Sequence, residues 1–430
     1  MRFRKLLLSL GVVAGGVGVA ITSLAIATVY ASPTGPIPTS ILGQGSDTTM
    51  FVMNAMDQLY GLSAGCNNIG SSQTPTEVQV HNNQCYSPDP AGTITSENYA
   101  HDQVHEGWFV GSSEGIFELD HQTTPGTAHV DFARSSRGPR SSDLTGLSFV
   151  AYAQDAIIWE AWDRGTTASG IHAMNNTHGG CAAHPNTTCL TPLDLYHIYG
   201  DCTYVNWNQV GGQNVAMTRY AFQPSSGTES TFNAFLATAG GVSTVDADLC
   251  PGTQVIPENN NAPIVAAGTQ DSAIAPFSVG VWAEQAWFAG GVKPGLLDGV
   301  GVSIPTMQNG SYAWTRLLYN VYCRSTCAGG GSNAPTVKYV GEEGWICKPQ
   351  ADTHTTNPNF TGHVADPFSN VDPAKQLNYF TEIQATIQGG NLTLSPSVLG
   401  TGKGSVFLPL TLGTIGSGDS NQDYCRLLTT

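Results

Sequence analysis

The chain contains few charged residues, and basic residues are the scarcest of them. Charged residues make up 11% of 430 positions, and 16 Lys and Arg stand against 32 Asp and Glu, so the formal net charge is −16. Nucleic-acid-binding proteins generally need a basic face, which this composition does not supply. The apolar fraction of 40% argues against a disordered chain, and collagen-like or coiled-coil periods are absent from the sequence.

Long apolar runs are also scarce, because only residues 6–29 form one that could span a bilayer. A short basic segment precedes this run, and Val29 and Ala31 place small residues at the positions that signal peptidase requires. We therefore expect residues 1–31 to be a signal peptide and the mature protein to be secreted or extracytoplasmic, at a bacterial cell surface or in a periplasm. A retained membrane anchor is the alternative.

Ten cysteines in such a chain favour an oxidising location and up to five disulfides. Sequence alone leaves the pairing open, and the near neighbours Cys66–Cys85, Cys181–Cys189 and Cys202–Cys250 are the pairs that we favour. One segment resembles a metal site, but its spacing matches no common zinc pattern, and we expect a disulfide-closed loop without metal. Its residues are His172, His178, Cys181, His184 and Cys189.

Four segments share one pattern, in which an apolar strand leads into a Gly-, Ser- or Thr-rich loop and then, in most of them, a helix. In the last of them, Ser226 and Glu229 have the spacing of a capping box, which indicates a helix start. Alternating strands and helices predict an α/β fold with largely parallel sheets, in which ligands lie at the carboxyl ends of the strands. The four loops are residues 43–49, 111–115, 134–139 and 223–229.

Loops of this kind are suited to small anions. A helix N-terminus offers free N–H groups and a partial positive charge, hydroxyls add donors with little bulk, and glycine lets the backbone approach closely. Each loop alone is ordinary helix capping more often than a binding site. Four together, one of which carries two of the few basic residues, Arg134 and Arg137, predict a small-oxyanion site.

The order and spacing of these loops resemble the phosphate-binding proteins of ABC importers, in the type 2 periplasmic-binding-protein class. The resemblance extends from about residue 41 to about residue 285, and it implies an anion ligand with no cofactor and no metal. Residues 43–48, 111–116, 130–136 and 226–228 are similar to the four ligand loops of that family. The expected ligand-binding residues are Asp47, Thr48, Thr49, Ser113, Arg134, Ser135, Ser136, Arg137, Ser226, Gly227 and Thr228.

The resemblance also implies a two-lobed α/β architecture, with a hinge of two crossing strands and the ligand in the interlobe cleft. Residues 147–152 and 156–159 would form the first crossing, and residues 273–278 the second. Lobe one would then comprise residues 40–150 and 277–430, and lobe two residues 151–276. The family further implies a monomer that works with an ABC transporter permease.

This sequence departs from the family pattern at two positions. Ser136 stands where the family has an Asp that accepts a hydrogen bond from protonated phosphate, and Phe222 stands where it has an Arg. Arg134 would then supply the cation, because a guanidinium grips an oxyanion with two donors. Asp47 is the candidate replacement for the acceptor; a site without an acceptor would favour sulfate over phosphate.

Two other functions remain open on the sequence alone. Residues 111–115 fit Gly-x-Ser-x-Gly, the nucleophile elbow of α/β-hydrolases, so Ser113 could act in a secreted serine hydrolase or phosphatase, with Asp271 and His363 in the right chain order. The third class is a secreted surface protein on the same fold that binds no ligand. We favour the solute-binding protein, with phosphate first and another oxyanion second.

Overall fold

The computed structural model describes residues 40–41, 43–50, 52–53, 56, 79–80, 111–121, 130–162, 174–284, 291–324, 334–342, 344, 346–347, 408–409 and 425–429. The chain divides into two compact units, residues 1–31 and 32–430, and every described residue lies in the second. No helix among these residues has the length and apolar character that crossing a membrane requires. The expected signal peptide lies outside the described residues.

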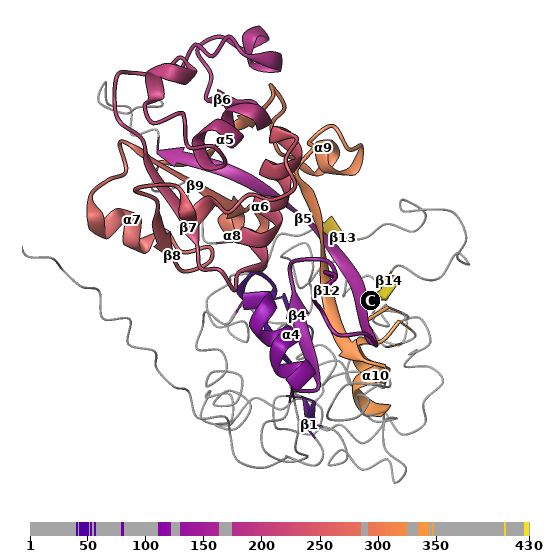
Figure 1. The fold of residues 1–430 in the computed structure, drawn as a ribbon. Helices are drawn as coiled ribbons and strands as arrows, with labels where there is room; N and C mark the ends of the chain where they lie inside the picture. The colour runs from indigo at the N-terminus through magenta and orange to yellow at the C-terminus, as the bar shows by residue number, and fades with distance from the viewer. Residues whose placement is uncertain are drawn as a thin grey trace, which may run out of the picture. The chain divides into compact units, whose positions relative to one another are not determined.

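The centre of the fold is a mixed ten-stranded sheet with helices beside it (Figure 1). Its main path runs β2-β4-β12-β5-β9-β7-β8, and β10, β13 and β14 each pair with β5. The strands of this sheet are β2 (Gly43–Gly45), β4 (Phe132–Ser135), β5 (Leu147–Trp162), β7 (Thr218–Phe222), β8 (Gln254–Ile256), β9 (Ala273–Ser278), β10 (Val292–Pro294), β12 (Thr315–Cys323), β13 (Leu408–Pro409) and β14 (Arg426–Thr429).

Shorter strands and the helices complete the described elements. Two two-stranded parallel sheets are formed by β1 (Ser40–Ile41) with β3 (Gln79–Val80) and by β6 (Cys189–Leu190) with β11 (Leu296–Leu297). The α-helices are α4 (Gly111–His121), α5 (Pro192–Tyr199), α6 (Gly227–Gly240), α7 (Ala262–Ala267), α8 (Val279–Glu284), α9 (Ile304–Gln308) and α10 (Ala334–Val340), and the 3-10 helices are η1 (Asp47–Thr49), η2 (Gly179–Ala183), η3 (Trp207–Val210) and η4 (Ala247–Leu249).

The α/β class is confirmed, but the expectation of a largely parallel main sheet is wrong. β2 pairs in parallel with β4, and β7 with both β8 and β9. β5, however, is antiparallel to every strand that it pairs with. With 16 residues, β5 is long enough to pair with five other described strands.

The two segments expected to form the first crossing belong to one continuous strand, β5. Its first part, residues 147–156, pairs with β12, whereas residues 157–161 pair with β9, the strand expected to form the second crossing. Figure 1 shows β5 as one long arrow beside β12. β5 and β9 therefore lie side by side and antiparallel, and a two-lobed arrangement around them stays a prediction.

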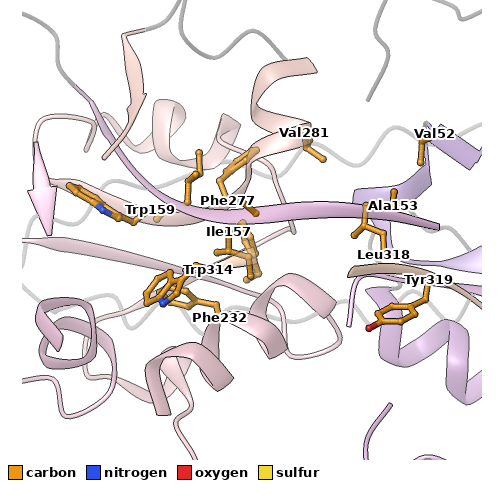
Figure 2. Packing of buried hydrophobic residues seen from close by; sticks show 14 of the residues in the cluster. Val52, Ala153, Ile157, Trp159, Phe232, Phe277, Val281, Trp314, Leu318 and Tyr319 are labelled. Atoms are coloured by element: carbon orange, nitrogen blue, oxygen red, sulfur yellow. The ribbon is translucent and has the colours of Figure 1, made fainter. Parts of the chain in front are cut away.

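Apolar side chains of β5 carry much of the core (Figure 2). Ile157 and Trp159 on this strand are fully buried, as is Phe277 on β9. On α6, Phe232 meets Trp314 edge-on, with ring centroids 5.7 Å apart. Burying large side chains on both a strand and the helix beside it fixes the position of α6 against the sheet.

Two of the three favoured near-neighbour disulfides are confirmed. Cys181 is bonded to Cys189 and Cys202 to Cys250, and a third bond joins Cys347 to Cys425. Because Cys181 and Cys189 bond each other, the segment that resembled a metal site is a disulfide-closed loop, as expected. Among the described residues, no group of three His, Cys, Asp or Glu side chains could hold a metal ion. Cys66–Cys85 lies outside the described residues.

Candidate functional site

Three serine hydroxyls from three of the predicted loops meet in the interior. We call Ser46, Ser112 and Ser136 the serine cluster, and all three are fully buried. Ser46 Oγ donates to Ser136 Oγ at 2.9 Å, and Ser112 Oγ lies 3.2 Å from Ser136 Oγ. The backbone N–H of Ser136 also donates to Ser112 Oγ at 2.9 Å. The first, second and third loops are thus joined by side-chain hydrogen bonds.

The fourth loop reaches the same place through a glycine. Ser226 caps α6, and its Oγ accepts from the N–H of Glu229 at 3.0 Å, so the predicted helix start is confirmed. A Cβ added to Gly227 would lie 2.1 Å from Ser112 Oγ and 2.4 Å from Ser136 Oγ. Only glycine therefore lets the first turn of α6 lie directly against the serine cluster.

A second group of polar side chains lies at the same helix start. We call Thr48, Thr228 and Glu258 the threonine cradle, and all three are buried. Thr48 Oγ1 donates to Glu258 Oε1 at 2.7 Å, Thr228 Oγ1 bonds the same oxygen, and the two hydroxyls are 3.1 Å apart. Asn259 Nδ2 donates to Thr48 Oγ1 at 2.9 Å. The cradle joins η1, α6 and the segment before α7.

The two predicted arginines have different surroundings. Arg137 forms a bidentate ion pair with Asp143, with both contacts at 2.8 Å, and its Nε lies 3.3 Å from Ser113 Oγ. Arg134 is buried, and it donates to the carbonyls of Gly43 at 3.0 Å and Ser46 at 3.4 Å. These bonds of Arg134 fix the backbone of the first loop, and its role as an anion ligand stays a prediction.

The remaining predicted residues stabilise the loops locally. Ser135 Oγ donates to the carbonyl of Arg137 at 2.8 Å and so closes a turn after β4. Thr49 Oγ1 donates to the carbonyl of Ser46 at 3.4 Å. Asp47 begins η1, where a carboxylate interacts favourably with the helix dipole. Contact between these side chains and a ligand stays a prediction.

An open cavity of about 550 Å³ lies beside the serine cluster. One wall is the segment from Arg137 to Arg140, and another is α6, which contributes Ser230 and Thr231. Thr231 Oγ1 donates to the carbonyl of Gly227 at 2.9 Å and lies 3.3 Å from the carbonyl of Ser136, so this wall lies next to the cluster. The lining carries charges of both signs, because Arg137 and Arg140 are accompanied by Glu229 and Asp246.

A buried ion pair within the main sheet contacts the third loop. Arg316 on β12 donates to Asp155 Oδ2 on β5 at 2.7 and 3.0 Å, and Nη1 of Arg316 donates to the carbonyl of Ser136 at 3.2 Å. Asp155 also accepts from Ser278 Oγ at 2.9 Å. The third loop is therefore tied to β12 and, through Asp155, to both β5 and β9.

The structure brings some of the predicted residues together and adds others, and ligand binding by any of them stays a prediction. Thr48, Ser136, Gly227 and Thr228 were predicted, and the structure brings them to the start of α6. The missed residues are Ser46, Ser112, Glu258, Asn259, Asp155 and Arg316. Ser46 and Ser112 lie inside the predicted loops, each one residue from a predicted position. Glu258 carries no motif, and only the fold brings it to Thr48, 210 residues away.

The hydrolase pattern at residues 111–115 lies in the first turn of α4. Ser113 Oγ accepts from Arg137 Nε, and its N–H donates to the carbonyl of Ser225 at 3.1 Å. A guanidinium remains protonated, so Arg137 cannot serve as the base that a serine nucleophile needs. His363 lies outside the described residues.

Comparisons with known proteins identify solved structures only; no family model and no curated protein matches the chain. The chain is similar to a putative phosphate ABC transporter substrate-binding protein with bound phosphate from Clostridium perfringens, at 18% identity and a TM-score of 0.43, over 71% of this chain and 96% of that one. An ABC-type phosphate transport receptor from Vibrio cholerae has 18% identity and a TM-score of 0.40, over 65% and 86%. PstS from Borrelia burgdorferi has 18% identity and a TM-score of 0.37, over 66% and 86%. The expected resemblance to phosphate-binding proteins of ABC transporters is therefore also found among solved structures.

Proposed function

We propose that the chain is an exported solute-binding protein that captures a small oxyanion, most readily inorganic phosphate. One observation carries the proposal: Gly227, at the first turn of α6, lies directly against hydroxyls from two other loops. A helix start offers N–H donors and a partial positive charge, and the serine hydroxyls add donors around it. In a site shielded from water, each hydrogen bond to an anion counts for more than in bulk solvent.

The site's chemistry suits a tetrahedral oxyanion better than a planar or extended ligand. Its hydroxyls come from η1, from α4, from the residue after β4 and from α6, and so they approach from several directions. Each can donate one hydrogen bond and also accept one, so the same groups can serve a protonated or an ionised oxygen. Phosphate and sulfate are the two ligands to compare.

We further propose that the site lies between two lobes, residues 40–150 with 277–430 and residues 151–276. Ser46, Ser112 and Ser136 belong to the first set, whereas Gly227 and Glu258 belong to the second. The antiparallel pairing of β5 with β9 supports a hinge of two crossing strands. Relative movement of two such lobes would open and close the site, as in other proteins that close around a ligand.

The cellular setting forms part of the same proposal. Residues 1–31 would direct export to the periplasm or the cell surface, and the mature protein would deliver its ligand as a monomer to an ABC permease. Disulfides among the described residues suit an oxidising compartment.

Titration calorimetry of the purified chain with phosphate, and then sulfate, tests the proposed function. We expect one-to-one binding of phosphate that weakens in Ser136→Ala and, if Arg134 is the cation, in Arg134→Ala. Ser311→Ala, a hydroxyl deletion at an exposed residue outside the cavity lining, is the matched control and should bind as the wild type does. Absence of binding with both anions would overturn the proposal, and reaction of Ser113 with a fluorophosphonate probe would then favour the hydrolase.

A further inference from the structure

The threonine cradle already holds an oxygen anion, and that anion is part of the protein. Glu258 Oε1 receives a hydrogen bond from Thr48 Oγ1 at 2.7 Å, a second from Thr228 Oγ1, and a third from the N–H of Thr228 at 3.3 Å. Glu258 is only 3% exposed. A helix start and two hydroxyls thus converge on one carboxylate oxygen, in the arrangement that an external oxyanion would need.

These donors cannot serve a second acceptor at the same time. A hydroxyl has one proton, and that of Thr48 is directed to Glu258 while its oxygen accepts from Asn259 Nδ2. Thr228 donates both its hydroxyl proton and its N–H to the same carboxylate. An external oxyanion that uses the donors of Thr48 and Thr228 must therefore take these bonds away from Glu258.

Charge reinforces this competition. The hydrogen-bond partners of Glu258 Oε1 are hydroxyls and an N–H, all uncharged, and Oε2 is buried with no hydrogen-bond partner among the described residues. A buried carboxylate with only neutral partners repels a second anion brought next to it. Both effects penalise an external oxyanion while Glu258 stays in the cradle.

The backbone next to Glu258 is held in place by the neighbouring residue, Asn259. The next residue, Asn259, has a φ of +54°, in the left-handed region that asparagine tolerates better than most residues. Its side chain donates to Thr48 Oγ1 and accepts from the N–H of Ser278 at 2.9 Å. Asn259 thereby anchors this turn to the cradle on one side and to the end of β9 on the other.

We propose that Glu258 is an internal ligand of the anion site, and that an external oxyanion binds by replacing its carboxylate at Thr48 and Thr228. This inference rests on the proposed function, and it goes further by assigning the site a competitor within its own chain. The affinity of the wild-type protein for phosphate is then set by an exchange of one oxyanion for another.

The test is calorimetric titration of the full chain with phosphate in the wild type, Glu258→Ala and Glu258→Gln. In Glu258→Ala, the donors of Thr48 and Thr228 no longer bond a carboxylate of the chain. Regaining one charge-assisted hydrogen bond changes an affinity by about tenfold or more, so we expect this variant to bind phosphate at least about tenfold more tightly. Glu258→Gln keeps the side-chain size and one acceptor for the threonines, so it should keep the fold and show part of the gain. Glu342→Ala removes one partly exposed carboxylate and should match the wild type.

A second probe reports on the vacated position directly. Acetate carries the carboxylate that Glu258→Ala has lost, so it should raise the melting temperature of that variant and leave the wild type unchanged. Weaker phosphate binding by folded Glu258→Ala and Glu258→Gln would overturn the inference and leave the proposed function intact, because Glu258 would then assist the ligand. Absence of phosphate and sulfate binding in all three folded proteins would instead overturn the proposed function.

Discussion

Arg316 and Asp155 form a buried ion pair, with Nη2 and Nε of the arginine 2.7 and 3.0 Å from the same carboxylate oxygen. The side chains are 4% and 0% exposed. Ser278 Oγ and the N–H of Gly280 donate to the carboxylate as well, and Arg316 also holds the carbonyl of Ser136. This pair connects the paired strands β5, β9 and β12 to a loop of the site.

Replacing one partner of this pair should destabilise the protein strongly. Arg316→Met leaves the Asp155 carboxylate buried without a countercharge, so we expect the free energy of unfolding to fall by about 3–5 kcal/mol. Urea denaturation measures this change. The control is Arg324→Met, because Arg324 is 55% exposed and 3.8 Å from Glu342, and an exposed pair contributes less than about 1 kcal/mol.

A double variant separates the pair from the individual side chains. Arg316→Met combined with Asp155→Asn removes both charges, so its loss should be smaller than the sum of the two single losses. Strict additivity would show that the two side chains stabilise the strands independently.

The sequence predicts local features of the fold better than long-range ones. The start of α6 follows from Ser226 and Glu229, three positions apart, and the disulfides Cys181–Cys189 and Cys202–Cys250 join near neighbours. These features depend on the spacing of a few residues. By contrast, the antiparallel insertion of β12 between β4 and β5 depends on pairing across more than 150 residues, for which the sequence carries no local signal.

The same distinction applies to the site. Gly227 and Thr228 belong to a recognisable helix-start motif, so the sequence identifies them. Glu258 lies between β8 and α7 in a polar turn that resembles many surface turns, and only the folded chain places it at Thr48. In the sequence, Arg316 is likewise one charged residue in a mostly apolar segment. Only the folded sheet places Asp155 opposite it.

Glu229 should make stability depend on pH. Burial raises the pKa of its carboxyl from 4.5 to about 8, although the N–H of Phe222 donates to one of its oxygens at 2.8 Å. Between about pH 4.5 and pH 8 the folded state keeps a proton that the unfolded state has lost. The free energy of unfolding should therefore fall with rising pH over this range, by up to about 1.4 kcal/mol per pH unit.

Glu229→Gln provides the comparison for this prediction. The amide resembles the protonated acid and cannot ionise, so the variant should lose this contribution and gain stability relative to the wild type as pH rises from 5 to 8. Urea midpoints at pH 5, 6.5 and 8 measure the difference. Parallel pH profiles for the two proteins would show that Glu229 ionises in the folded state as it does in the unfolded state.

Gly227→Ala should weaken anion binding while leaving α6 helical. The new Cβ would lie 2.1 Å from Ser112 Oγ and 2.4 Å from Ser136 Oγ, so the helix start and the serine cluster must move apart. Alanine itself favours a helix more than glycine does. We expect phosphate affinity to fall by about tenfold or more, because a cost of about 1.4 kcal/mol already produces that factor.

The control for this variant is another Gly→Ala change. A Cβ at Gly301 would lie 3.4 Å from the nearest atom, a methyl carbon of Leu296, which is an ordinary contact. Gly301→Ala should therefore bind phosphate as the wild type does. Unchanged affinity in Gly227→Ala would place the ligand away from the start of α6.

The two disulfides within residues 174–284 should contribute unequally to stability. Cys202–Cys250 spans 48 residues and Cys181–Cys189 only 8. A crosslink restricts the unfolded chain more when it closes a longer loop, which gives about 4 kcal/mol for the first bond and about 2.5 kcal/mol for the second.

Replacing each pair by two alanines and measuring urea unfolding tests this order. Cys181, Cys189 and Cys250 are buried, whereas Cys202 is partly exposed, so the alanine substitutions remove comparable packing at three of the four positions. An equal or larger loss for the Cys181–Cys189 pair would mean that the short loop stabilises the folded state directly, through the packing of η2 and β6, rather than by restricting the unfolded chain.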